Sequence, residues 1–163
     1  MAESIEITPE MRAQIGLESD PWPYEVTAPG VRAFARGVGY TDPVHYDPDA
    51  ARAAGYKHLP VPPGYFGTPV FLPGQSDPVF STPPGTGPRP RYGLTEVLDG
   101  STEVFYERPL LAGETFVARH RLVDLQVKQS RSLGAMLVVT SETILRDSNG
   151  NVAARERSQH IFY

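Results

Sequence analysis

The residues best suited to chemistry lie in one short stretch, residues 39–48, which reads Gly-Tyr-Thr-Asp-Pro-Val-His-Tyr-Asp-Pro. Histidine is the side chain whose ordinary pKa lies near neutrality, and a histidine within reach of carboxylates and phenols suits general acid/base catalysis. His45 is therefore the candidate catalytic residue, with Asp42 or Tyr40 as its partner. Pro43 restricts the backbone just before His45, which predicts a defined turn rather than a floppy loop.

The two aspartates of this stretch also have structural interpretations. Asp47 precedes Pro48 and an alanine-rich run that stops at Gly55, the pattern of a helix N-cap, so we expect capping rather than catalysis. Asp42 fits a turn-forming residue as well as it fits a catalytic one, and both interpretations stay open.

The remaining histidines and Tyr46 carry weaker signals. Tyr46 is expected to pack, and His58 to lie in a solvated loop or at the mouth of a pocket. His120 and His160 are expected on strand faces. No set of His, Asp and Glu has the spacing of metal ligands, so the sequence predicts no metal and no cofactor.

Short helices are expected to position this stretch. Residues 7–15 suit a helix that starts after Thr8, with Pro9 at its first position. Thr27 can cap a second helix, whose apolar residues recur at i, i+3, i+4 and i+7: Val31, Phe34, Ala35 and Val38. Residues 63–71 are apolar and predict the beginning of a further helix, shortened or kinked by prolines.

The second half of the chain predicts strands. Five segments are rich in Val, Thr, Phe and Ile: residues 94–98, 102–108, 114–127, 135–146 and 152–162. The connectors have turn chemistry, namely Asp99-Gly100, Ala112-Gly113 and residues 147–150. Long sequential strands with short turns pair antiparallel. We therefore predict an α+β fold in which a helix packs on one face of a curled antiparallel sheet.

Composition limits the class of protein. The chain has 163 residues, no cysteine and a net charge of −4. The length suits one domain, residues 1–163, and the absence of cysteine excludes disulfides and thiol catalysis. The acidic balance disfavours nucleic-acid binding. No apolar run is long enough to span a membrane and no secretory leader is evident, so we expect a cytoplasmic protein.

Proline is concentrated in the middle of the chain. Twelve of the 17 prolines lie between Pro43 and Pro90, and residues 72–90 have the composition of a loop. Such a long loop is either a disordered surface insertion or a functional element. On the second interpretation it forms a lid over the site, with Val79 and Phe80 touching the ligand.

Residues 42–48, Asp-Pro-Val-His-Tyr-Asp-Pro, resemble the motif of the MaoC-like family of (R)-specific enoyl-thioester hydratases and dehydratases, which have the hotdog fold. Further segments are similar: residues 53–57, Pro60-Val61-Pro62-Pro63, the Arg-Pro-x-x-x-Gly turn at residues 108–113, and the hairpin at residues 147–153. The similarity is greatest to the N-terminal-type MaoC dehydratase domain. It implies a sheet that wraps a central helix.

The resemblance also implies roles for individual residues. The family's catalytic histidine falls on His45, whereas the position of its aspartate holds Tyr40 and the position of its asparagine holds Asp42. A phenol is a poor base at pH 7, because its ordinary pKa is near 10. A backbone N–H at the start of the central helix, from Gly64 or Tyr65, would polarise the thioester carbonyl.

The neighbouring apolar segment, including Phe66, would line the acyl pocket, and Lys57, Arg89 and Arg91 are candidates to meet coenzyme-A phosphates. The leading hypothesis is a hydratase or dehydratase of enoyl or β-hydroxyacyl thioesters, carried by coenzyme A or acyl carrier protein. A non-catalytic, substrate-binding subunit of a heteromeric dehydratase and a hotdog thioesterase are the alternatives. The resemblance further implies a homodimer or a pair with another hotdog chain.

Overall fold

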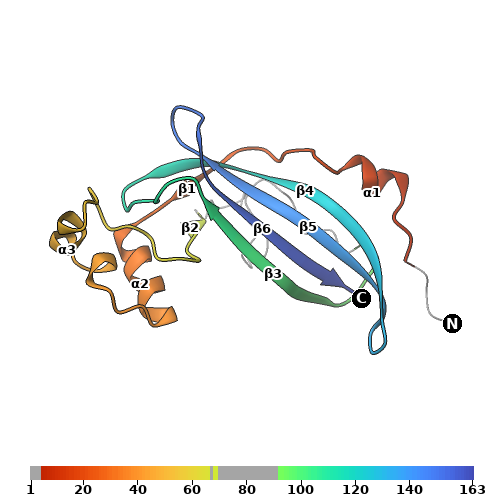
Figure 1. The fold of residues 1–163 in the computed structure, drawn as a ribbon. Helices are drawn as coiled ribbons and strands as arrows, with labels where there is room; N and C mark the ends of the chain where they lie inside the picture. The colour runs from red at the N-terminus through yellow and green to blue at the C-terminus, as the bar shows by residue number, and fades with distance from the viewer. Residues whose placement is uncertain (1–4, 67, 70–91) are drawn as a thin grey trace.

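The computed structural model describes residues 5–66, 68–69 and 92–163, and its main feature is one curled antiparallel sheet (Figure 1). The strand order is β2-β1-β4-β5-β6-β3. In chain order the elements are α1 (Pro9–Ala13), β1 (Trp22–Glu25), α2 (Ala28–Val38), the 3₁₀ helix η1 (Pro43–His45), α3 (Pro48–Ala53), β2 (Thr68–Pro69), β3 (Val97–Tyr106), β4 (Thr115–Ser130), β5 (Gly134–Arg146) and β6 (Val152–Phe162). The predicted α+β class is confirmed.

Three of the predicted helix starts are confirmed, because each is fixed by local side-chain chemistry. Thr8, Thr27 and Asp47 are the N-caps of α1, α2 and α3, and each is followed by a proline in the first turn. Helix α2 ends at Gly39, whose left-handed φ of 82° suits glycine. Helices α2 and α3 lie together at one end of the sheet (Figure 1).

One face of the sheet carries the core. Alternation along β6 places Ala154, Glu156 and Phe162 on this face, opposite Leu145, Thr143 and Leu137 of β5. The core forms two clusters. Helix α2 and residues 59–66 pack on one cluster, which is centred on Trp22, Phe116 and Leu145, and residues 5–11 cover the other, around Leu137.

The opposite face of the sheet carries a row of alternating charges. Cross-strand pairing lines up Glu103, Arg157, Glu142 and Arg121 on β3, β6, β5 and β4, and Glu18 continues the row beside β4. Glu142 is buried, and both Arg121 and Arg157 donate hydrogen bonds to its carboxylate, at 3.0 and 3.3 Å. The paired arginines compensate for the burial of this charge.

Two element predictions are wrong, and the first is the turn at Asp99-Gly100. Residues 94–98 and 102–108 were expected as separate strands, but β3 runs unbroken from Val97 to Tyr106 along β6. The register shifts between Asp99 and Ser101, so Gly100 occupies a bulge. A Cβ at Gly100 would lie 3.2 Å from the carbonyl oxygen of Gln159, so any larger residue would require this backbone to shift.

The second wrong element prediction is the helix expected to begin in residues 63–71. In the described part of this range, residues 63–66 form a turn and β2 pairs with β1. Gly64 has a φ of +85°, and Tyr65 donates its amide hydrogen to the carbonyl of Pro62 at 3.1 Å. A left-handed residue directly after two prolines prevents a right-handed helix from starting here, so these residues do not begin the expected central helix.

The predicted lid, residues 72–90, lies outside the described residues. Among the helices of the described ranges, none is long and apolar enough to cross a membrane.

Candidate functional site

The predicted turn around His45 is built by two aspartate caps. The Asp42 carboxylate accepts the amide hydrogen of Val44 at 3.0 Å and so starts η1, which ends at His45. The Asp47 carboxylate accepts the amide hydrogen of Asp49 at 2.9 Å and starts α3. These caps fix the backbone on both sides of His45, whose side chain is only 8% exposed.

A single hydrogen bond fixes the orientation of the His45 ring. Nδ1 lies 2.9 Å from the carbonyl oxygen of Pro60. A carbonyl oxygen can only accept, so Nδ1 carries the hydrogen, and the neutral ring presents Nε2 as its proton acceptor. Pro60 is itself held in place, because it forms a bridge with Leu111. The sequence did not reveal this acceptor, which is a backbone atom 15 residues away.

Tyr40 packs against the imidazole of His45. The two rings meet edge to face, with their centroids 5.9 Å apart, and 38% of Tyr40 is exposed. Tyr46 donates its hydroxyl hydrogen to the Tyr40 carbonyl at 2.6 Å and so braces this neighbour of His45. Tyr40 and His45 are therefore brought together as expected, whereas the carboxylate of Asp42 is engaged with the backbone of η1.

The predicted substrate-binding residues form an aromatic wall next to the turn at Gly64. Tyr65 and Phe66 are 5% and 7% exposed. Tyr65 packs edge to face on Phe34 at 5.3 Å, and Phe66 packs similarly on Tyr24 at 5.6 Å. The backbone N–H groups expected to polarise a carbonyl lie in a turn rather than at the start of a helix, and that of Tyr65 already donates to the Pro62 carbonyl.

Two functional candidates escaped the sequence analysis, and both lie on the core-bearing face beside this wall. Tyr106 donates its hydroxyl hydrogen to the Tyr65 carbonyl at 2.5 Å. Burial raises the pKa of Tyr106 to about 12, against a backbone hydrogen bond from Gly64, and the nearby Glu156 and Tyr40 add to the increase. Tyr106 therefore stays protonated at neutral pH and is a hydrogen-bond donor.

Glu156 is the second functional candidate that the sequence analysis missed. Burial raises the pKa of its carboxyl group, and the same carboxyl group contributes to the raised pKa of Tyr24, after the larger effect of burial. Among the described residues, this carboxylate makes no hydrogen bond or salt bridge. The available signal was strand alternation, which places a lone glutamate on the face that holds Ala154 and Phe162.

A pocket of about 470 Å³ opens beside the His45 turn. Its walls come from the end of β1, the first half of α2, helix α3, the loop at residues 57–59 and the turn at residues 112–115. The predicted Lys57 and His58 line it. In the ranges that the structure describes, no three His, Asp, Glu or Cys side chains come together as metal ligands.

Comparisons with known protein families and sequences relate this chain to dehydratases. The family description "FAS1-like, dehydratase domain region" matches residues 13–156. A UPF0336 protein of Clavibacter michiganensis subsp. michiganensis is 33% identical over 144 residues, or 88% of this chain and 87% of that protein. A probable enoyl-CoA hydratase alpha subunit of Thermomonospora curvata is 25% identical over 138 residues, which are 81% of this chain and 43% of that protein.

Solved structures match the sheet. The ChsH1–ChsH2 complex from Mycobacterium tuberculosis contains a chain with a TM-score of 0.66 and 20% identity, covering 90% of this chain and 84% of that one. A MaoC-like dehydratase has a TM-score of 0.63 and 20% identity, covering 93% of this chain and 42% of the other. The resemblance drawn from the sequence is thereby confirmed: the chain belongs to the FAS1-like dehydratase family and has the hotdog fold of MaoC-like proteins.

Proposed function

We propose that this protein adds water to enoyl thioesters, or removes it from β-hydroxyacyl thioesters, with His45 as the acid/base residue. The observation that carries the proposal is the hydrogen bond from His45 Nδ1 to the Pro60 carbonyl. This bond leaves Nε2 as the one ring nitrogen able to take a proton from water. The family match and the enoyl-CoA hydratase relative support this reaction class.

In the hydration direction, Nε2 of His45 removes a proton from water as the water oxygen bonds to the β-carbon. The electrons of the double bond move onto the thioester oxygen, where the Gly64 backbone N–H stabilises the negative charge by exchanging its bond to Tyr106 for one to the substrate, since the Tyr65 N–H already donates to the Pro62 carbonyl. The proton on Nε2 then passes to the α-carbon, which restores the carbonyl. Dehydration is the same sequence in reverse, and no metal or redox cofactor is required for it.

This chain lacks the aspartate that the family places beside its catalytic histidine, and two groups are candidates for its role. Tyr40 occupies its position and touches the His45 ring, so we propose that its phenol orients the imidazole or the attacking water. Asp42 acts on the same ring indirectly, through the backbone of η1.

A second candidate function is a substrate-binding subunit that needs a catalytic partner. The replacement of the family acid by Tyr40 favours it, as does the name of the Thermomonospora relative, an alpha subunit. In that case the paired chain, and not His45, would supply the acid/base group.

The test is the rate of enoyl-CoA hydration by the purified chain, alone and with candidate hotdog partners. We expect His45→Ala to lower kcat at least ~10²-fold, the usual contribution of a general acid/base group, while circular dichroism stays unchanged. His160→Ala is the matched control, since it removes a half-buried histidine from β6. Full activity of His45→Ala in an active protein or complex would contradict the assignment. Release of free thiol instead of hydration would point to a thioesterase.

A further inference from the structure

Glu156 is a half-buried carboxyl group on the core-bearing face of the sheet, and within the described ranges it makes no hydrogen bond or salt bridge. Among the described side chains, Nε1 of Trp22 is the one fully buried nitrogen or oxygen that lacks a hydrogen bond. The carboxyl oxygens of Glu156 lack one too but are not fully buried, so they remain accessible. Burial also raises the pKa of this group. An ionisable group that is desolvated, unpaired and still accessible is a candidate for function.

The polar neighbours of Glu156 across the sheet are engaged with other partners. Thr143 lies directly opposite on β5, and Nδ1 of His120 lies 3.1 Å from its hydroxyl oxygen. Tyr106 is the diagonal neighbour on β3, and its hydroxyl group is bonded twice to the turn at residues 64–65. The carboxyl group of Glu156 therefore has room for a hydrogen-bond donor that the described residues do not supply.

Tyr106 connects this carboxyl group to the catalytic candidate. Its hydroxyl oxygen accepts the N–H of Gly64, the group proposed to hold the thioester oxygen. After the larger effect of burial, the nearby Glu156 and Tyr40 raise the pKa of Tyr106, so both lie close to its ring. Tyr40 in turn packs on the ring of His45, with centroids 5.9 Å apart. An acyl group held at the Gly64 N–H would therefore have its reacting carbons between His45 and Glu156.

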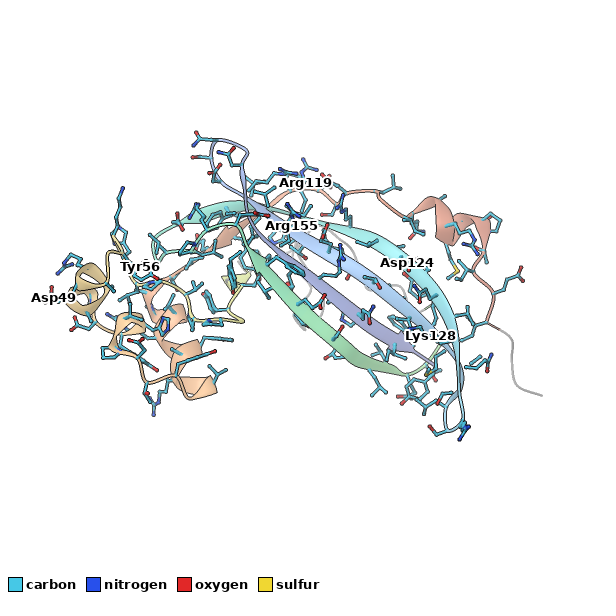
Figure 2. All side chains as sticks on the ribbon, in the orientation of Figure 1. Asp49, Tyr56, Arg119, Asp124, Lys128 and Arg155 are labelled. Atoms are coloured by element: carbon cyan, nitrogen blue, oxygen red, sulfur yellow. The ribbon has the colours of Figure 1, made fainter. Side chains whose placement is uncertain are left out.

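The two groups approach this position from different elements. Arg155, the residue before Glu156, lies in the half of the sheet nearer to α2 and α3, whereas Lys128 lies at the far end (Figure 2). His45 comes from the helical side, because η1 connects α2 to α3. Its Nε2, like the carboxyl oxygens, is not among the fully buried atoms that lack a partner, so it too is accessible.

The attacking water has two hydrogens, and the proposed reaction uses only one of them. Nε2 of His45 removes that one as a proton. An acceptor for the other hydrogen would hold the oxygen with a lone pair directed at the β-carbon. A carboxylate suits this task, because charge-assisted hydrogen bonds are roughly twice as strong as neutral ones. Tyr40 offers only a phenol, and the Asp42 carboxylate caps η1.

We propose that Glu156 is this second acceptor, whose carboxylate holds the hydrogen of the attacking water that His45 does not remove. In dehydration the same carboxylate accepts the hydrogen of the β-hydroxyl group, which leaves as water once it has received the proton from His45. Glu156 neither gains nor loses a proton, so the proton balance of the reaction is unchanged. The inference rests on the proposed function, and Tyr40 then orients the imidazole.

Two variants of Glu156 test the proposal in the protein alone and with candidate hotdog partners. The substrates are trans-2-enoyl-CoA thioesters from crotonyl-CoA upward, and loss of the conjugated double bond is followed by absorbance. Glu156→Gln keeps a neutral acceptor, so we expect kcat to fall roughly tenfold. Glu156→Leu removes the acceptor, and we expect a fall of about 10²-fold. Circular dichroism and thermal melts at neutral pH should show both variants folded, with Glu156→Gln at least as stable as wild type.

The acid limb of the pH profile separates this role from a structural one. The reaction needs His45 neutral and Glu156 ionised, so both groups contribute to the rise of log kcat/KM with pH. We expect Glu156→Gln to lower the slope of this limb by about one, because one ionisation is lost. The other titratable side chains near this carboxyl group are Tyr24, Tyr106 and His120, and all three are unchanged in the variant.

Glu103→Gln and Glu103→Leu are the matched controls, because Glu103 is exposed on the opposite face of the neighbouring strand β3. Both should keep the rate and the pH profile of wild type. Full activity of Glu156→Leu in an active protein, or an unchanged acid limb in Glu156→Gln, would overturn the proposal and leave the proposed function intact. A protein that hydrates none of these thioesters, alone or with a partner, would overturn both.

Discussion

At the scale of single residues, the Asp42 carboxylate is a cap whose removal acts on the turn ahead of His45. We predict that Asp42→Asn, which keeps a capping oxygen, retains activity within a few-fold of wild type. Asp42→Ala should lose about 1 kcal/mol of unfolding free energy, the usual cost of removing a cap, and some activity with it. Urea unfolding and initial rates measure both quantities.

The asparagine variant separates the two roles given to Asp42. A catalytic partner of His45 needs its negative charge, whereas a cap needs only an oxygen acceptor. If Asp42→Asn loses as much activity as His45→Ala, Asp42 is the catalytic partner and the capping interpretation is insufficient.

A second residue-scale prediction concerns the pH dependence of stability. Burial raises the pKa of Glu156 above its ordinary value of 4.5, so the folded state holds this proton more tightly than the unfolded state. The resulting stabilisation is present below about pH 4.5 and is lost as pH rises through the raised folded pKa. Glu156→Gln should therefore raise Tm at neutral pH and flatten this part of the pH profile.

Thermal melts from pH 4 to pH 8 measure this effect. Glu103→Gln is the matched control, since Glu103 is exposed on the opposite face of the sheet, and its profile should follow wild type. A Glu156→Gln profile with the slope of wild type would show that the buried carboxyl group does not titrate as described.

The sequence predicted the positions of those candidate residues that are set locally. Asp47 and the turn containing His45 depend on caps and prolines within a few positions of each other, and both are where the pattern placed them. Tyr106 and Glu156 reach the site only because β3 and β6 pair with each other, with Tyr106 opposite Ala154. No short-range pattern contains such a pairing, so these residues emerge only from the folded sheet.

At the scale of elements, the bulge in β3 depends on one glycine. A Cβ at Gly100 would lie 3.2 Å from the Gln159 carbonyl oxygen and 3.3 Å from a methyl group of Ile161. We predict that Gly100→Ala loses roughly 1–2 kcal/mol of unfolding free energy, because backbone or neighbour must move. Gly37→Ala in α2 meets nothing within 4 Å and should instead stabilise the protein by up to about 1 kcal/mol.

Chemical denaturation of the two alanine variants checks that Gly100→Ala lowers the unfolding free energy and that Gly37→Ala raises it. Two variants of equal stability would mean that β3 relaxes around the added methyl group, and that the bulge is not sterically fixed.

The same glycine shows why element boundaries were harder to predict than element types. An Asp-Gly pair suits a tight turn and a bulge equally, and only the length of the neighbouring strand decides between them. The prediction for residues 63–66 was wrong for a similar reason. Their apolar character suggested a helix, but the left-handed conformation of Gly64 turns the chain away from one. The Thr27 and Asp47 caps had no such competing interpretation.

At the scale of the whole molecule, the sheet order ends at β3, and in the described ranges no further strand lies beyond it. Val97, Leu98 and Phe105 of this strand are 40%, 45% and 49% exposed. Exposed edge backbone with apolar side chains is a site of strand pairing. We predict a second hotdog chain along β3, either another copy or a related protein.

Light scattering at micromolar concentration should therefore show about 36 kDa, twice the 17.9 kDa of one chain, or a monomer that shifts when the partner is added. Phe105→Lys should weaken this association, whereas Val117→Lys, an equally exposed change on β4, should not. A monomer that takes up no hotdog partner would contradict the prediction. A cytoplasmic location likewise stays a prediction, which fractionation of cells would test.

The contact between His45 and Pro60 has a consequence for how this protein can change over evolutionary time. The acceptor is a main-chain oxygen, so no exchange of the side chain at position 60 can delete it. A mutational scan would find the histidine sensitive and its partner silent. Replacement of the backbone amide by an ester at Pro60–Val61 would weaken the acceptor, and it would also remove the Val61 N–H that donates to the Leu110 carbonyl at 3.0 Å. Relatives can thus diverge around this position while the ring keeps the same tautomer.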